Sequence, residues 1–233
     1  GRAYPVRLYP IPEEQRRRLV DSLNYMRRYS VWSLIVIYLG LAIFGWLWEV
    51  ALHLITYGTF VNRGALQGPW LPIYGLGSVL ILTVLARLRR HPVLEFCTAI
   101  VLCGFLEYMT SVFMEFTTGG KKWWDYSGYF LNLNGRISAE GLLAFGIGGI
   151  AVVYVLAPLI DNIVNRISMK ILRPVCIAVA SVYLVDFIYS QFYPNTGSGI
   201  TDIYAKIETC DAYAAGPEHP YGINVYTGIV QEY

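Results

Sequence analysis

The fold is decided by the stretch FGWLWEVALHLITYGTFVNRGALQGPWLPIYGLG, residues 44–77, which places Glu49 deep inside an apolar segment. An Asn-Arg-Gly string follows at 62–64, and the chain then enters a second apolar segment through closely spaced glycines and prolines. Regular helix cannot be continuous where these two residue types are so dense. Because broken backbone at membrane depth survives only where protein covers it or where it lines a wet cavity, the stretch predicts the wall of a site.

A second stretch, residues 104–149, repeats this order of residues in a weaker form. Gly-Phe-Leu-Glu at 104–107 echoes Gly-Trp-Leu-Trp-Glu at 45–49, and Asn-Gly-Arg at 134–136 echoes the string at 62–64. Since the first helix of each stretch would cross in the same direction, we predict two tandem parallel repeats, as in transporters whose site lies between repeats. Chance similarity of short strings in a biased composition is the alternative.

The composition is strongly apolar, with 55% hydrophobic residues among 233 and a mean hydropathy of +0.45. An ordinary soluble domain is less apolar, and here the apolar residues come in long runs. A bilayer core about 30 Å thick requires about 20 apolar residues in a helix. We therefore predict an all-α fold, a polytopic membrane helix bundle with five spans at 31–55, 69–86, 93–116, 138–160 and 172–193.

The basic residues are divided unequally between the two sides of the predicted spans. Lys and Arg concentrate in cytoplasmic segments near the ends of spans. With the N-terminus inside, those segments hold 13 of the 18 Lys and Arg residues, whereas the opposite orientation reverses the ratio. We therefore predict an N-in, C-out protein of the bacterial cell membrane. This topology and anionic lipid account for the basic charge, so no nucleic-acid partner is expected.

Two terminal segments flank the membrane domain, which we place at 31–193. Residues 11–29 carry apolar side chains at helical spacing, opposite a set of arginines that includes Arg27. This pattern predicts, within the 1–30 region, an amphipathic helix lying on the cytoplasmic leaflet. Residues 194–233 are polar and rich in turn-forming residues, and they predict a small extracytoplasmic tail that caps the protein or pairs with a partner.

Three acids lie deep in the outer halves of the predicted spans: Glu49, Glu107 and Asp186. A carboxylate within a span costs at least about 2.5 kcal/mol unless it is paired, neutralised or hydrated. Arg63 and Arg136, which end the two outer connections, are natural partners because guanidinium binds carboxylate bidentately. Two interpretations stay open. In the first, the two repeats are each held together by a buried ion pair, Glu49–Arg63 in one and Glu107–Arg136 in the other. In the second, the same groups line an outward-facing polar cavity for a polar substrate or a proton.

We predict a substrate-binding site that draws charged and aromatic side chains from both units, namely Glu49, Arg63, Tyr74, Glu107, Trp124, Asp125 and Arg136. The aromatic loop 123–130 would lie over its outer mouth and gate it. The four cysteines lack metal or redox spacing, and we expect no metal site and no cofactor. No set of nucleophile, base and orienting residue is visible, so the catalytic residues of any reaction are unknown.

Several strings together carry a family resemblance: Gly-Trp-Leu-Trp-Glu at 45–49, Asn-Arg-Gly at 62–64, Gly-Pro-Trp-Leu-Pro-Ile-Tyr-Gly at 68–75, Leu-Glu-Tyr at 106–108, Trp-Asp-Tyr-Ser at 124–127 and Asn-Gly-Arg-Ile at 134–137. Over about residues 40–160, the chain resembles the bacterial membrane proteins described as putative ABC-transporter type IV. The resemblance implies a permease-like membrane protein. The nucleotide-binding pattern GxxxxGK[ST] does not occur in the chain, so any ATPase would be a separate subunit.

Three functions fit these observations. The leading one is a transport-associated membrane protein, not an enzyme, with membrane lipid and a separate ATPase or another membrane subunit as partners. A membrane-embedded enzyme acting on a lipid or lipid-linked headgroup, with a carboxylate as general base, ranks lower because no catalytic set is visible. A non-catalytic scaffold or sensor subunit, contacting a partner through the tail and residues 117–137, is the third. A homo-oligomer is compatible with each.

Overall fold

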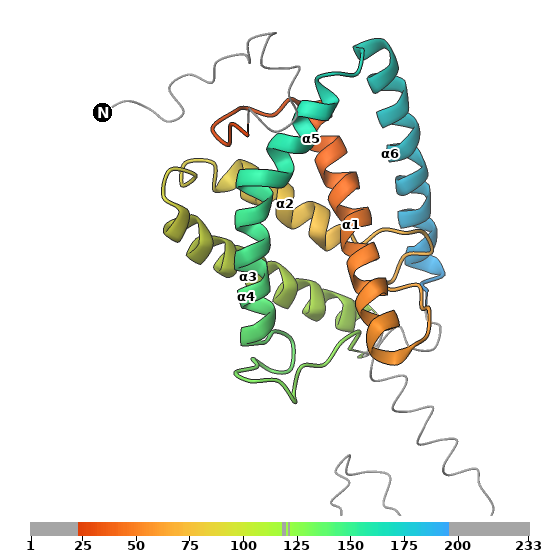
Figure 1. Cartoon of the computed structure of the whole chain (residues 1–233). Helices are drawn as coiled ribbons and strands as arrows, with labels where there is room; N and C mark the ends of the chain where they lie inside the picture. The colour runs from red at the N-terminus through yellow and green to blue at the C-terminus, as the bar shows by residue number, and fades with distance from the viewer. Residues whose placement is uncertain (1–22, 118–119, 121, 196–233) are drawn as a thin grey trace, which may run out of the picture.

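The computed structural model describes residues 23–117, 120 and 122–195. Within this part of the chain every regular element is a helix, apart from an isolated bridge between Leu133 and Ile137. The elements are α1 (Val31–Tyr57), α2 (Pro72–Val84), α3 (Pro92–Thr117), α4 (Ala139–Ala151), the π-helical η2 (Val152–Leu156), α5 (Ala157–Val164) and α6 (Met169–Phe192) (Figure 1). The all-α prediction is confirmed.

The helices begin and end at residues whose chemistry suits those positions. Ser30 and Ser138 precede α1 and α4, and each accepts a hydrogen bond from a backbone amide in the first turn, Ser33 N at 3.0 Å and Gly141 N at 3.3 Å. Such caps satisfy amide groups that have no partner within the helix. Gly58 ends α1 in the left-handed conformation, with φ of 71°, which glycine adopts without steric cost.

Helices α4, η2 and α5 run on from one another as a single long helix, Ala139–Val164. The π-helical turn η2 comes directly before α5, whose second residue is Pro158. Proline has no amide hydrogen and its ring clashes with the preceding turn of an α-helix, so the wider turn lets the helix continue through it.

Four helices are long and apolar enough to cross a membrane: α1, α3, the α4–η2–α5 helix and α6. The chain is therefore a multi-pass membrane protein. Helix α2 has 13 residues and is about 20 Å long at 1.5 Å per residue, less than a bilayer core of about 30 Å. The fifth span, predicted at 69–86, stays a prediction.

Helix α2 is short because the chain before it is not helical, as the glycines and prolines predict. Residues 69–71 form an irregular approach, and Pro72 occupies the start of the helix. The Leu71 amide donates to the carbonyl of Ala42 in α1 at 3.0 Å. Protein therefore covers the break, which is one of the two conditions under which broken backbone survives at membrane depth.

The most extensive helix contacts join α1 to α2 and α3 to α4, so the described chain contains two helical hairpins. Glycines make the close approach possible in both. A Cβ on Gly45 would overlap the Tyr74 ring, and one on Gly104 would overlap the side chain of Leu142. Small residues at helix interfaces let backbones approach closely. The two hairpins thus share a packing device, although the proposal that they are repeats stays a prediction.

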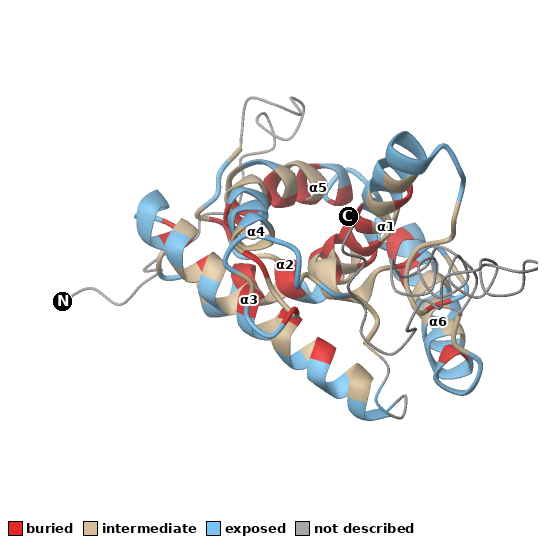
Figure 2. Ribbon diagram, turned by 90° about the horizontal axis from the view of Figure 1, so that it is seen from below, coloured by how far each residue is buried: buried red, intermediate tan, exposed pale blue. Residues whose placement is uncertain are grey.

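The buried core and the exposed faces are both apolar. Ile37, Ile81 and Val153 belong to a buried cluster between α1, α2 and η2. Figure 2 shows that α3 and α6, in contrast, leave much of their outer surface exposed. Large apolar side chains cover these exposed faces, such as Phe105 on α3 and Val185 on α6. Contiguous exposed apolar surface of this kind suits helices that face lipid.

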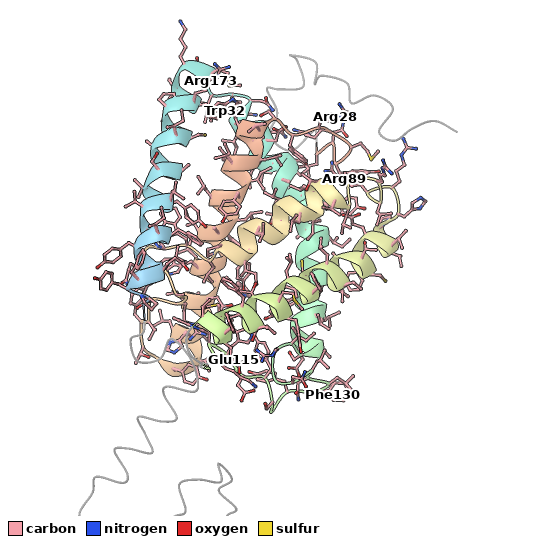
Figure 3. All side chains as sticks on the ribbon, turned by 180° about the vertical axis from the view of Figure 1, so that it is seen from behind. Arg28, Trp32, Arg89, Glu115, Phe130 and Arg173 are labelled. Atoms are coloured by element: carbon pink, nitrogen blue, oxygen red, sulfur yellow. The ribbon has the colours of Figure 1, made fainter. Side chains whose placement is uncertain are left out.

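Charge distinguishes the two ends of the bundle. Arg28, Arg89 and Arg173 lie at the end where α1 begins, which we call the basic end (Figure 3). Glu115 and Phe130 lie at the other end, which we call the opposite end. The positive-inside rule would place the basic end in the cytoplasm. The N-in orientation rests on that rule and stays a prediction.

The described part of the N-terminal segment differs from the amphipathic helix predicted at 11–29. Residues 1–22 lie outside the described chain, and residues 23–30 form a turn and irregular backbone instead of helix. Arg27, expected on a solvated polar face, is 4% exposed and pairs with an acid of α5. A turn at this place frees the arginine to point into the bundle. Of the tail predicted at 194–233, residues 196–233 lie outside the described chain.

Candidate functional site

Glu49, near the end of α1, has two partners from its own hairpin. Its Oε2 lies 3.7 Å from a guanidinium nitrogen of Arg63, and its Oε1 accepts a hydrogen bond of 2.8 Å from the Tyr74 hydroxyl. Gly45, one turn before Glu49, leaves the space that the Tyr74 ring occupies. The predicted Glu49–Arg63 pair is therefore present, with a tyrosine as an additional donor.

The connection between α1 and α2 holds Arg63 in place through its own polar contacts. Trp46 Nε1 donates to Asn62 Oδ1 at 2.6 Å, and Asn62 Nδ2 donates to the carbonyl of Gln67 at 2.8 Å. Gly64 follows in a left-handed conformation, with φ of 95°, that side chains rarely adopt. The Asn-Arg-Gly string thus forms a turn, in which the asparagine ties the loop to α1 and the glycine reverses the chain.

Glu107 of α3 is 7% exposed and carries an unused acceptor. Its Oε1 accepts a hydrogen bond of 3.2 Å from the Tyr126 hydroxyl, and its buried Oε2 has no hydrogen-bond partner among the described residues. The Glu49 carboxylate lies within electrostatic range of Glu107, and Tyr74 lies within range of both Glu107 and Tyr126. The five residues Glu49, Arg63, Tyr74, Glu107 and Tyr126 form what we call the carboxylate cluster.

Tyr126 brings the loop between α3 and α4 onto the carboxylate cluster. Its amide donates to the carbonyl of Gly135 at 2.7 Å, which fixes this part of the loop. Burial, followed by the nearby carboxylates of Glu107 and Glu49, raises the pKa of the Tyr126 phenol well above its ordinary value of about 10. The phenol therefore stays protonated and acts as a hydrogen-bond donor to Glu107.

Arg136 has a different partner from the one predicted. Its guanidinium pairs with Glu115 and donates to Ser111 Oγ at 3.0 Å, while Tyr126 takes the place expected for it beside Glu107. Glu115 is eight residues beyond Glu107, about 12 Å further along α3 and on nearly the same face. Because Arg136 is held at the level of Glu115, the expected Glu107–Arg136 pair does not form.

Trp124 and Asp125 shape the loop that carries Tyr126. Trp124 Nε1 donates to the carbonyl of Arg136 at 3.0 Å. Asp125 is exposed, and its Oδ1 accepts hydrogen bonds from both the amide and the hydroxyl of Ser127. A carboxylate that binds the backbone two residues on forms an Asx-turn. These two predicted site residues therefore have loop-building contacts, while Glu49, Arg63, Tyr74 and Glu107 meet in the carboxylate cluster.

Asp186, the third acid predicted deep in the outer half of a span, fastens α6 to the irregular segment before α2. Its Oδ2 accepts a hydrogen bond of 3.0 Å from the Gly68 amide, and the neighbouring Gln67 amide donates to Ser190 Oγ at 3.2 Å. Asp186 is half-buried, and a carboxylate that accepts a backbone amide has its hydrogen-bonding capacity used within the fold. Asp186 thus fastens the irregular segment that is predicted to line the site.

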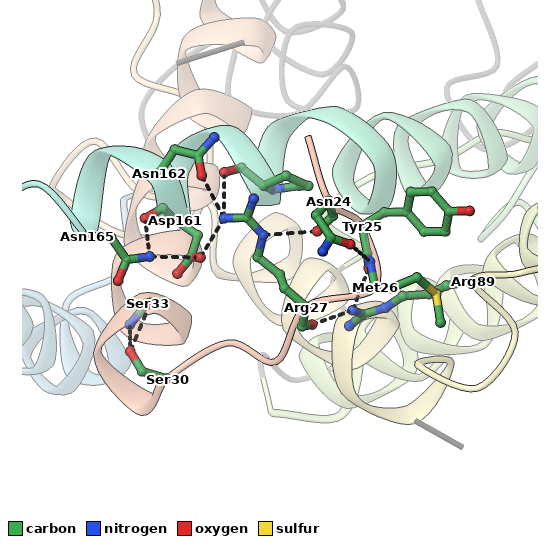
Figure 4. Close-up of polar contacts among 11 residues, drawn as sticks. Asn24, Tyr25, Met26, Arg27, Ser30, Ser33, Arg89, Asp161, Asn162 and Asn165 are labelled. Atoms are coloured by element: carbon green, nitrogen blue, oxygen red, sulfur yellow. Dashed lines mark hydrogen bonds and ion pairs between the residues drawn. The ribbon is translucent and has the colours of Figure 1, made fainter. Parts of the chain in front are cut away.

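A second polar cluster lies at the basic end, and the sequence interpretation missed it. Arg27 Nη1 donates to Asp161 Oδ2 at 2.8 Å and to Asn162 Oδ1 at 2.7 Å, and Asn165 Nδ2 also donates to Asp161 Oδ2, at 3.0 Å (Figure 4). Arg27 and Asp161 are both 4% exposed. This pair joins the segment before α1 to α5, two parts of the chain that are far apart in sequence.

Arg89, in the turn between α2 and α3, completes the basic end. Its guanidinium donates to the carbonyls of Tyr25 at 2.9 Å and Arg27 at 3.0 Å, and also to the carbonyl of Leu82. The Tyr154 hydroxyl donates to the carbonyl of Arg89 at 2.8 Å. One arginine therefore ties the N-terminal segment, α2 and η2 together.

The carboxylate cluster can bind a proton or a molecule that donates hydrogen bonds. Two acids from different hairpins approach each other there, with Arg63 as the cation paired to Glu49. In the described part of the chain, no group of three or more His, Cys, Asp or Glu side chains is placed to hold a metal ion. Tyr126, the donor to Glu107, was visible in the sequence only as one of several loop aromatics.

Comparison with known proteins agrees with the resemblance seen in the sequence. The model of the family described as "Putative ABC-transporter type IV" matches residues 36–191, more than half of the 233-residue chain. This match reaches α6, beyond the residues that carry the resemblance, about 40–160. Neither the curated proteins nor the solved structures contain a match to the chain. The matched segment covers both helical hairpins and the carboxylate cluster, and the chain belongs to the Putative ABC-transporter type IV family.

Proposed function

We propose that the chain is a permease-like subunit of a transport system, and that the carboxylate cluster is its binding site for a polar, hydrogen-bond-donating substrate. The family and the four long apolar helices fit a membrane protein associated with transport. The observation that carries the specific proposal is Glu107 Oε2, a buried acceptor with no donor among the described residues. A buried, unpaired carboxylate oxygen is costly, so a ligand that brings a donor to it is stabilised.

The position of the cluster between the hairpins supports this proposal. Glu49 and Tyr74 come from the first hairpin, Glu107 from the second, and Tyr126 from the loop that closes the second. A relative movement of the hairpins would change the distance between the two carboxylates. A ligand bound to both would therefore favour one arrangement over another, which is the requirement for coupling binding to movement.

The loop 122–137 is the proposed gate of this site. It is fastened to α3 by the Arg136–Glu115 pair and reaches Glu107 through the Tyr126 hydroxyl. The cluster and the loop lie toward the opposite end of the bundle, where Figure 3 places Glu115 and Phe130. With the basic end in the cytoplasm of a bacterial cell, the site would open to the extracytoplasmic side.

The proposed energy source is a separate ATPase, because the chain itself lacks the GxxxxGK[ST] pattern. The basic end is the surface that would meet a cytoplasmic partner. Membrane lipid would contact the exposed apolar faces of α3 and α6.

Ligand binding by purified protein in lipid nanodiscs tests the proposal. The probes are a panel of ammonium compounds, amino acids and sugars, and the readout is the ligand-induced rise in unfolding temperature. We expect a probe that stabilises the wild type to lose most of its effect with Glu107→Gln. Glu140→Gln is the matched control, because Glu140 is an exposed acid in the first turn of α4. Equal stabilisation of the wild type and Glu107→Gln by every binding probe would refute the assignment of the site.

A further inference from the structure

A third buried acid, Glu95, lies in the first turn of α3 and has no role in the proposed site. It is 0% exposed, and neither of its carboxyl oxygens has a hydrogen-bond partner among the described residues. Twelve residues separate it from Glu107, about 18 Å along the helix. A fully buried carboxylate without donors is among the most costly groups that a protein can contain.

The packing of α3 against α4 and η2 gives Glu95 its surroundings. Gly104 faces Leu142, whereas Gly146 faces Phe96 and Ile100, so the two helices are antiparallel, and the contact of Gly149 with Ala99 shows how closely they pack. One turn further toward the basic end, Glu95 comes to the level of η2, where Val153 is fully buried. No carboxylate-binding cation is supplied by α4 at this level.

Few titratable or charged groups face Glu95 in the described part of the chain. Arg89, from the turn before α3, lies within electrostatic range, as does the Tyr154 phenol from η2. Tyr25, from the N-terminal segment, stacks edge-on against Tyr154 with ring centroids 4.9 Å apart. Directly before α3, His91 is exposed and accepts a hydrogen bond from the Glu95 amide at its backbone carbonyl.

Arg89 is the only cation in this group, and its hydrogen bonds go elsewhere. Its terminal nitrogens bind the carbonyls of Tyr25, Arg27 and Leu82, while its buried Nε has no hydrogen-bond partner among the described residues. An unfilled donor on Arg89 and two unfilled acceptors on Glu95 thus lie near each other without meeting. The arginine has two alternative sets of partners, the three carbonyls or the Glu95 carboxylate.

We propose that Glu95 is a second proton-binding site, protonated while Arg89 is held by the three carbonyls and deprotonated when Arg89 moves onto it. The proton removes the charge that would otherwise be buried without a donor. Movement of Arg89 onto Glu95 would release the carbonyls of Tyr25 and Arg27, and would therefore loosen the N-terminal segment. Proton release and movement at the basic end would occur together. This site is separate from the carboxylate cluster and does not rest on its function.

Infrared difference spectroscopy on the full chain in lipid nanodiscs tests this proposal, because a protonated carboxyl group has a carbonyl band that a carboxylate lacks. We expect the wild type at neutral pH to show a protonated-carboxyl band, sensitive to deuterium exchange, that Glu95→Gln lacks. Glu140→Gln should leave this band unchanged. Identical protonated-carboxyl bands in the wild type and Glu95→Gln at every pH would overturn the proposal.

Two further variants separate the proton from the fold. If Glu95→Gln does not fold, Glu95→Asp can be used in protein whose glutamates carry ¹³C. The band of residue 95 should then disappear from the ¹³C-shifted carboxyl bands, because the aspartate introduced at this position is unlabelled. Arg89→Met should keep the Glu95 band to higher pH than the wild type, because a nearby cation favours the deprotonated form. A Glu95 band that disappears at the same pH with and without Arg89 would refute the coupling between them.

Discussion

Replacing Asp161 by alanine removes the acid that Arg27 binds inside the bundle. Arg27 would remain buried, with Asn162 Oδ1 at 2.7 Å and the carbonyl of Pro158 at 3.4 Å still near its Nη1. Asn165 Nδ2 would lose its bond to Oδ2 but keep its 2.8 Å bond to the backbone carbonyl. Breaking a buried ion pair by removing one partner costs about 3–5 kcal/mol. Because Arg27 keeps two neutral acceptors, we expect about 3 kcal/mol.

The free energy of unfolding, measured by denaturant titration in mixed micelles, is the assay. Asp161→Asn should cost less than Asp161→Ala, because the amide oxygen still accepts from Arg27 although its charge is gone. Arg27→Met removes the other partner of the ion pair. Its matched control is Arg28→Met, because Arg28 is the adjacent residue and is exposed. An exposed substitution of this kind should change stability by no more than about 0.5 kcal/mol.

A double-mutant cycle distinguishes the pair from its surroundings. Replacement of a buried ion pair by apolar residues of similar size is often neutral. We therefore expect Arg27→Met with Asp161→Leu to be less destabilised than the sum of the two single changes, by at least about 1 kcal/mol. If the single changes are additive, or if Asp161→Ala unfolds at the same denaturant concentration as Arg28→Met, the pair does not hold the N-terminal segment to α5.

Three further predictions concern the opposite end and the first hairpin. Gly45→Ala should cost about 1–3 kcal/mol of unfolding free energy, because the added methyl overlaps a tyrosine ring, whereas Gly40→Ala has nothing within 4 Å of the new methyl and should not destabilise. Arg136→Ala should speed proteolysis of the loop 122–137 several-fold, because the arginine fastens that loop to α3. Burial raises the pKa of Tyr126, so its neutral form stabilises the fold below a pH of about 10, and this stabilisation is lost as the pH rises further. In Tyr126→Phe this pH-dependent loss of stability should be absent, as measured by the unfolding temperature at increasing pH.

Each of these has an outcome that would contradict it. If Gly45→Ala and Gly40→Ala change the free energy of unfolding equally, the Tyr74 ring moves aside for the new methyl and the close contact at Gly45 is not required. Arg87 is exposed in the turn before α3, and an equal gain in proteolysis with Arg87→Ala would show that the loop effect is not specific to Arg136. Stability that falls equally in the wild type and Tyr126→Phe above pH of about 10 would assign the loss to other tyrosines.

The helices and their breaks were predictable because they depend on local chemistry. Runs of about 20 apolar residues predict membrane-length helices, and the dense glycines and prolines predict the irregular approach to α2. The Glu49–Arg63 pair was also predictable, because both residues belong to one hairpin and lie 14 residues apart. Depth along a helix follows from residue number alone at 1.5 Å per residue.

Contacts between helices were not predictable in the same way, because residue number does not say which helix lies beside which face. Glu107 was correctly identified as a buried acid, yet its partner is Tyr126 and not Arg136. Arg27 was placed on a solvated face, although it reaches Asp161 across the bundle.

The sequence by itself determined that this is an all-α membrane protein of the Putative ABC-transporter type IV family, with acids in its spans and a helix break beside the first of them. Only the tertiary structure decided which acids are satisfied and which are not. Asp186 and Asp161 have donors from other elements, whereas Glu107 and Glu95 retain acceptors without donors among the described residues. The physical reason is that the cost of burying a carboxylate depends on donors brought by packing, and packing joins segments that the sequence separates.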